Sequence, residues 1–166
     1  VSGDTINVPS GVTINNNGTQ TGFGGTNTPM FMAKPSSNIS FSNDTITNVT
    51  MTEVFDSDNA FASNTFTVPS GKAGKYWIGA KLQFFIGSQG SMFIAYIKKN
   101  GSQALYGREQ FNANSFYQKS LHIFGILDLA VGDAITVDVY CSISGSSGQV
   151  NGSATESWFQ GYKLIT

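Results

Sequence analysis

Residues able to do acid–base, nucleophilic or redox chemistry are scarce in this chain of 166 residues. His122 is the only histidine, and it lies inside the apolar run Leu121-His122-Ile123-Phe124. Acid–base catalysis would require a carboxylate or a nucleophile beside it, and the sequence points to neither. Cys141 is the only cysteine, so no disulfide can form within the chain. We therefore expect His122 to be structural and the protein not to be an enzyme.

The ten acidic residues form no recognisable site either. Asp56-Ser57-Asp58-Asn59 resembles the start of a calcium loop, but Ala60 and Phe61 stand where an EF-hand needs another oxygen ligand and a glycine. This segment favours a polar turn. No two carboxyls can be paired as a glycoside hydrolase requires, and nucleophile-elbow, zinc-protease and phosphate-loop motifs are missing from the sequence. The sequence predicts no catalytic residue and no bound cofactor.

Composition narrows the partners that the chain could bind. Only 11% of the residues are charged and the formal net charge is −1, which gives no electrostatic attraction to phosphate backbones or anionic lipids. No run of ~18 apolar residues is present, so nothing in the sequence predicts a membrane span. We expect neither nucleic-acid binding nor membrane insertion. Abundant Gly with 13 Phe, 6 Tyr and 2 Trp is typical of a weakly charged β-rich protein.

The elements that must hold any binding residues are β-strands, because apolar residues alternate along the chain. One face of the segment after Lys75 collects Tyr76, Ile78, Ala80, Leu82 and Phe84. We expect strands at 65–68, 75–84, 92–97, 121–129, 134–142 and 158–165, with turns at 69–71, 99–102 and 131–133. Many short strands with regular turns indicate an all-β fold, either an antiparallel β-sandwich or a jelly roll.

The first 28 residues differ from the rest. Ser2-Gly3-Asp4-Thr5-Ile6-Asn7 aligns with Ser10-Gly11-Val12-Thr13-Ile14-Asn15 at a spacing of eight, and Pro9 lies at the turn between them. Two such strands cannot form a hydrophobic core by themselves. They either pack on the domain that follows, here called the head, or form one layer of an intertwined fibre. A glycine-rich linker follows at 22–29. We expect a fibrous β-repeat stem and linker at 1–28 and a jelly-roll head at 29–166.

Several strands of the head are apolar on both faces, whereas one face of an antiparallel sandwich normally meets water. The second face then needs a cover, which a neighbouring subunit supplies best. We therefore expect the chain to form an oligomer. The candidate interface residues are Phe93, Tyr96, Phe124, Trp158, Phe159 and Tyr162.

A mixture of aromatic, amide and basic residues at 106–117 is typical of sugar-binding or protein-binding surfaces. The candidate receptor-binding residues are Tyr106, Arg108, Gln110, Asn112, Asn114 and Tyr117. The alternative is a strand pair whose aromatic residues belong to the core or to an interface. The segment 142–153 is small and polar and favours a loop.

Four landmarks in order resemble the trimeric heads of the first complement component's q subunit and, more distantly, the tumour necrosis factor superfamily. They are Phe66-Thr67-Val68-Pro69-Ser70-Gly71-Lys72-Ala73-Gly74-Lys75-Tyr76, Lys99-Asn100-Gly101, Leu129-Ala130-Val131-Gly132-Asp133 and Ser157-Trp158-Phe159-Gln160-Gly161-Tyr162-Lys163-Leu164. The resemblance covers the chain from about Met30 to its end. It implies a trimeric jelly roll whose outer loops bind a partner.

The same resemblance leaves a calcium site open at Asp56 and Asp58, because some relatives bind calcium near the trimer apex. No collagen repeat precedes the head, and the stem instead resembles the β-repeat fibres of tailed-phage tail proteins. Our hypothesis is a phage tail-fibre type head on the virion surface that binds a host cell-surface glycan or protein. The alternatives are a secreted, extracellular complement-like ligand or lectin, and an architectural fibre cap that binds no receptor.

Overall fold

The structure is a computed structural model, and it describes residues 9–13, 26–86, 90–110, 118–143, 148–153 and 155–165. The regular elements of these residues are strands. They are β1 (Met30–Pro35), β2 (Ile39–Phe41), β3 (Thr47–Asn48), β4 (Met51–Asp56), β5 (Phe61–Ala62), β6 (Thr65–Thr67), β7 (Gly74–Ile86), β8 (Gly90–Lys99), β9 (Ser102–Gln110), β10 (Gln118–Leu129), β11 (Ala134–Ile143), β12 (Gly148–Val150) and β13 (Trp158–Lys163). No helix long and apolar enough to cross a bilayer occurs among them.

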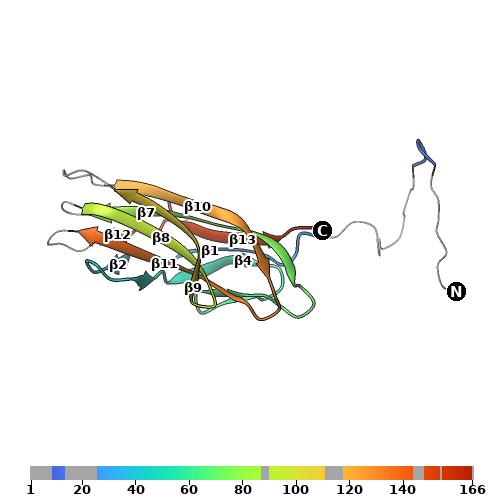
Figure 1. The fold of residues 1–166 in the computed structure, drawn as a ribbon, viewed down its shortest axis with the longest axis horizontal. Coiled ribbons are helices and arrows are strands. Elements are labelled where there is room, and N and C mark those ends of the chain that lie inside the picture. The colour runs from blue at the N-terminus through green and yellow to red at the C-terminus, as the bar shows by residue number, and fades with distance from the viewer. Residues whose placement is uncertain are drawn as a thin grey trace.

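The strands form two antiparallel sheets that pack face to face (Figure 1). Sheet A has the order β2-β12-β7-β13-β1-β4, and β10 pairs with the other edge of β7. Sheet B has the order β5-β6-β11-β8-β9, and β3 also pairs with β11. Most neighbours are far apart in sequence, as in the β1–β13 pair, which is the nested connectivity of a jelly roll, whereas β5–β6 and β8–β9 are consecutive hairpins. The expected all-β sandwich is confirmed.

The core lies between the inner faces of the two sheets. The alternation expected along β7 is confirmed, because Tyr76, Ile78, Ala80, Leu82 and Phe84 are all buried. Stacked aromatic pairs join the sheets along the core. The rings of Phe84 and Phe93 lie 4.4 Å apart, and those of Phe31 and Phe66 also lie 4.4 Å apart.

Turn chemistry explains why the strands end where they do. The Pro-Ser-Gly turn occurs twice: Val12 N–H donates to the carbonyl of Pro9, and Lys72 N–H donates to that of Pro69. Gly11 and Gly71 adopt positive φ in these two turns, as the third residue of a type II turn requires. In the β8–β9 hairpin Asn100 and Gly101 both have positive φ, the type I′ geometry that suits twisted strands.

The turn after β10 is held by the Asp133 carboxylate. This carboxylate accepts hydrogen bonds from the Ala130 N–H and the Asn100 amide, both at 2.7 Å, and pairs with Lys99 Nζ at 2.8 Å. The hydrogen bond from Lys99, followed by those from Asn100 and Ala130, lowers the pKa of Asp133 to about 2. The Asp133 carboxylate of the Leu-x-x-Gly-Asp landmark therefore links the turn after β10 to the turn between β8 and β9 by hydrogen bonds.

The sandwich has two distinct ends. Met30 on β1 pairs with Tyr162 on β13 near Lys163, so the chain enters and leaves the head at one end, here called the stem end (Figure 1). Phe85 and Gln118 lie at the opposite end, the far end. Residues 1–8 and 14–25 of the expected stem lie outside the described residues, so the expected boundary at residue 28 stays a prediction.

Candidate functional site

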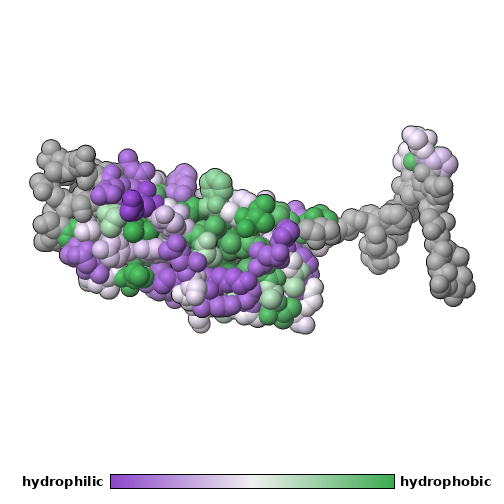
Figure 2. Space-filling view, viewed as in Figure 1, coloured by the Kyte–Doolittle hydropathy of each residue, from purple (hydrophilic) through white to green (hydrophobic). Residues whose placement is uncertain are grey.

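The outer face of sheet A is apolar near the stem end. Trp77 on β7 stacks on Tyr162 of β13 at 5.6 Å and on Phe124 of β10 at 6.4 Å. Phe124 is nevertheless 67% exposed, and Ile126, the cross-strand neighbour of Trp77, is 61% exposed. In Figure 2 the hydrophobic surface gathers over the half of the head nearer the stem end. Such a patch is unusual for a solvent-facing surface.

Exposed apolar side chains protrude from one edge of this face, and a groove lies towards its other edge. Phe124 and Ile126 protrude from β10, at one edge of sheet A. A groove of about 260 Å³ lies towards the other edge, where β13, β1 and β4 are neighbours. Its lining includes Met30, Phe55 and Tyr162. Exposed apolar side chains and a partly apolar groove therefore lie at opposite edges of the same face.

The six expected interface residues are distributed over three places. Phe124, Trp158 and Tyr162 lie on the outer face of sheet A. Phe124 and Tyr162 stack on Trp77, whereas Trp158 lies opposite Lys81, further from the stem end. Tyr96 lies on the opposite outer face, that of sheet B. These two faces point away from each other, so Tyr96 is not part of the sheet A patch, and its place in an interface stays a prediction.

Two of the expected interface residues are corrected by the structure. Phe93 is 1% exposed and stacks on Phe84, and Phe159 is 0% exposed between the rings of Phe31 and Phe61. Both side chains point inward from their strands and belong to the core of one chain. They have no surface to offer a second subunit. On β8 only the inner face is fully buried within the single chain.

The outer face of sheet B carries the described part of the expected receptor-binding segment. Tyr106, Arg108 and Gln110 all point outward from β9 and are exposed. Asn112, Asn114 and Tyr117 lie outside the described residues. The neighbouring strands complete this face with residues that sequence reasoning left unassigned to binding, Ile94 on β8 and Tyr140 on β11.

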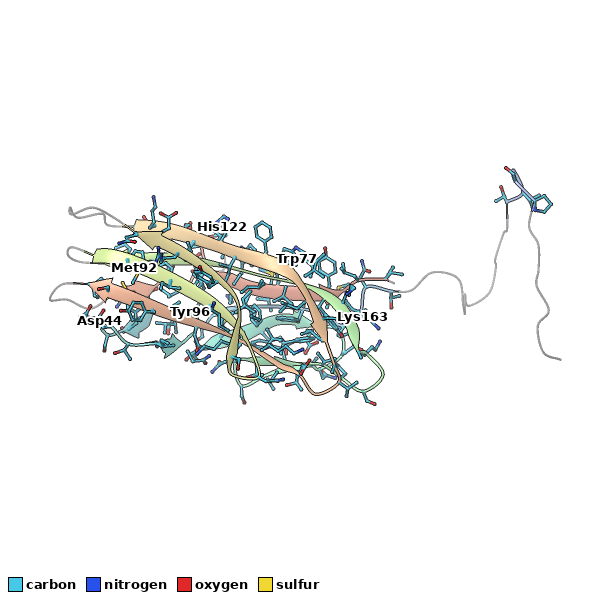
Figure 3. The ribbon with its side chains drawn as sticks, viewed as in Figure 1. Asp44, Trp77, Met92, Tyr96, His122 and Lys163 are labelled. Atoms are coloured by element: carbon cyan, nitrogen blue, oxygen red, sulfur yellow. The ribbon has the colours of Figure 1, made fainter. Side chains whose placement is uncertain are left out.

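Hydrogen bonds fix the polar residues of the sheet B face. The Tyr140 hydroxyl donates to Asp44 at 2.8 Å, and this bond is the largest cause that lowers the pKa of Asp44. Asp138, expected to point outward, does so but is buried, because Lys98 forms an ion pair with it and the Asn48 amide donates to it at 2.8 Å. Figure 3 shows Asp44, Met92 and Tyr96 along sheet B, with Trp77 and His122 along sheet A.

The two candidate calcium ligands occupy the expected polar turn after β4. The Asp56 carboxylate accepts hydrogen bonds from the backbone N–H groups of Asp58 and Phe61, at 3.1 and 2.6 Å. Asp58 forms an ion pair with Lys72 at 3.4 Å. Within the described residues no group of three acidic, histidine or cysteine side chains gathers at one point. A calcium site here stays a prediction, and the geometry adds no ligand to it.

The histidine and the cysteine lie in unlike surroundings. His122 is exposed on the outer face of sheet A, directly opposite the cation Lys81 rather than a carboxylate. Cys141 is buried in the core, and this burial, with a smaller contribution from Asp44, raises the pKa of its thiol to about 12. A thiol with such a pKa stays protonated and unreactive at neutral pH.

The topology and core define an antiparallel jelly roll, and its fold is similar to that of solved structures. Crystal structures of murine APRIL at pH 5.0, pH 8.0 and pH 8.5 are similar to this chain with TM-scores of 0.60, 0.58 and 0.55. Their identities to it are 16%, 17% and 18%, and each comparison covers 82% of this chain and 98% of the other. No family model and no curated protein matches the sequence.

Proposed function

We propose that this protein is an extracellular, homotrimeric binding head of the tumour necrosis factor-like kind, which attaches to a partner on a cell surface. The observation that carries the proposal is the apolar outer face of sheet A, with Phe124 and Ile126 at one edge and the Met30–Tyr162 groove at the other. A cyclic trimer covers this face, since each chain inserts its β10 edge against the groove of the next. The resemblance of the landmarks implies the same assembly.

Binding rather than catalysis is the role that the described side chains support. His122 lies opposite a lysine, and the thiol of Cys141 is buried. The Asp56 carboxylate accepts a backbone hydrogen bond, and Asp58 forms an ion pair with a lysine of the same chain. A trimer presents three identical partner sites, so attachment gains avidity without strong individual contacts. The low charge of the chain makes such attachment tolerant of salt.

A more specific setting, a phage tail-fibre or other virion head, rests on one sequence observation, the eight-residue Ser-Gly repeat before the linker. The fold likeness supports instead the broader class of extracellular ligand-like heads, among them a secreted complement-like ligand or lectin. Additional repeats upstream in the gene would favour the virion setting. A secretion signal followed by a collagen or coiled-coil stalk would favour the secreted ligand.

The test has two parts. Light scattering of the untagged chain, with and without dilution, gives the mass of the assembly, and we expect three chains. The labelled trimer is then applied to bacterial and animal cells, and saturable binding that unlabelled trimer displaces is expected on at least one type. A monomer at all concentrations would refute the proposal. A stable trimer that binds no cells would favour the architectural cap.

A further inference from the structure

The outer face of sheet B presents aromatic and polar side chains in cross-strand rows near the far end of the head. Tyr106 on β9 lies opposite Tyr96 on β8. In the next row Arg108 lies opposite Ile94, which lies opposite Tyr140 on β11. Strands are about 4.8 Å apart, and rows on one face about 7 Å apart. These five side chains therefore form a flat platform, about 10 Å across the strands, that could receive a short oligosaccharide.

On the outer face of sheet B, Asp138 has an ion-pair partner, whereas Arg108 has none among the described residues. Asp138 is paired with Lys98 and hydrogen-bonded by Asn48. No carboxylate of the described residues lies within ion-pair distance of Arg108, and the segment 111–117 contains no acidic residue. Arg108 thus lies at the β9 edge as a cation without a counter-ion. An arginine in this state favours an anion, and a carboxylate matches the planar fork of its guanidinium best.

The other edge of the platform suits a hydroxyl group. Asp44 lies beyond β11, about three strand spacings from Arg108. Its carboxylate accepts hydrogen bonds from the Tyr140 hydroxyl and the Asn43 amide, both at 2.8 Å, and from the Ser142 side chain, which leaves about one of its roughly four acceptor sites open. A ligand with an anionic group at one end and a hydroxyl group at the other would satisfy both edges.

The platform is poor in the apolar surface that a protein partner would need. Its aliphatic members are Ile94 and Met92, and both are already half-buried. The core of a protein–protein interface is apolar and depleted in charge, which describes the outer face of sheet A instead. Tyrosine rings offer an apolar face with a polar tip, so they can pack on the C–H face of a sugar ring while hydroxyl groups reach the polar residues around them.

This face is also the one that the proposed homotrimer leaves open. It lies on the opposite side of the sandwich from the outer face of sheet A, where Trp77 and Phe124 stack. Three copies of the platform would then face outward from one assembly, so weak individual sites can act together. This step rests on the proposed function.

From these observations we infer that the outer face of sheet B binds an acidic saccharide: Arg108 pairs with the sugar carboxylate while Tyr106, Tyr96 and Tyr140 pack against the sugar rings. The test uses the full chain, titrated in solution with galacturonate and sialyl oligosaccharides and with the methyl ester of each, which is neutral but otherwise matched. We expect each acid that binds to bind roughly tenfold or more tightly than its ester, as a charge-assisted hydrogen bond predicts.

Single substitutions test which residues cause the difference in affinity between the acid and its ester. In Arg108→Gln the acid should bind no better than its ester, whereas affinity for the ester should stay unchanged. Tyr106→Ala should weaken acid and ester by the same factor, because Tyr106 is 59% exposed and its ring carries no charge. Gln103→Ala, an exposed position at the other end of β9, is the matched control and should bind like the wild type. Unchanged thermal denaturation midpoints show that every variant is folded.

The inference is overturned if every acid binds no better than its ester, if no acidic saccharide binds, or if Arg108→Gln weakens acid and ester equally. It also fails if the trimer binds cells in a manner that protease abolishes and glycosidase does not. That last result would identify a protein partner and leave the proposed attachment function intact. A monomeric head that binds no cells would remove the attachment function itself.

Discussion

Replacing Phe124 with serine should dissociate the proposed trimer without unfolding the chain. A phenylalanine buries about 150–250 Å² when fully covered, and 67% of Phe124 is exposed in the single chain. About 100–170 Å² per chain is therefore available for a neighbour to cover. At about 25 cal/mol per Å² this area contributes roughly 2.5–4 kcal/mol to each interface.

A difference of 1.4 kcal/mol changes an equilibrium constant tenfold, so each contact should weaken on the order of a hundredfold. Three equivalent contacts close the ring, so the loss applies at each of them. The fold of the chain should change little, because the ring is mostly outside the core and substitutions at exposed positions usually cost within about 0.5 kcal/mol. The expected result is a folded monomer at concentrations where the wild type is a trimer.

Sedimentation velocity over a dilution series from micromolar to nanomolar concentrations measures this change. Val131→Ser is the matched control, because Val131 is an exposed apolar residue in the turn after β10 and lies outside the sheet A patch. This control should remain trimeric. The reasoning is wrong if Phe124→Ser dissociates at the same concentration as the wild type, or if the wild type is monomeric throughout.

Two further predictions concern the fold. The pKa of Asp133 is lowered to about 2, so its contribution to stability is complete above its ordinary pKa near 4 and is lost as the pH falls through 2. Urea unfolding from pH 5 to pH 2 should show this loss, and Asp133→Asn should be about 1–3 kcal/mol less stable at pH 5 with a flatter pH dependence; an unchanged slope would refute it. Gly161→Ala should cost about 1–3 kcal/mol, because a Cβ there would lie 2.5 Å from Ile78 Cδ1 and 3.0 Å from the Trp77 carbonyl oxygen. Thermal denaturation measures this, and a wild-type midpoint would show that the strands can separate to admit the methyl group.

Local signals in the sequence predicted β6, β7, β8, β10, β11 and β13 and the turns after β6, β8 and β10. They did not predict β1 or β4, and β9 was expected only as the alternative to a binding segment. The alternation along β7 and β11 marks the inward residues, because successive side chains of a strand point to opposite faces. The Pro-Ser-Gly and Asn-Gly turns are specified by residues that tolerate positive φ. The short strands β2, β3, β5 and β12 were not predicted, since two or three residues are too few to show a period.

Which face of a two-sided apolar strand becomes the core was decided only by the tertiary structure. A period of two separates Phe93 from Tyr96 and Phe159 from Trp158, but it does not say which member of each pair points inward. Packing against Phe84 and Phe31 settles that choice.

The apolar outer face of sheet A and the platform on sheet B also depend on the pairing of strands that are distant in sequence. Asp44 and Tyr140 are 96 residues apart and meet only because β11 passes beside the turn after β2. Tyr106, Tyr96 and Tyr140 likewise come from three strands whose register is set by long-range pairing. The sequence by itself determined the strands, the turns and the excess of apolar surface. The sorting of that surface into a core, an apolar outer face and a polar aromatic platform required the sheets to pair, because side chains distant in sequence acquire a common face only through that pairing.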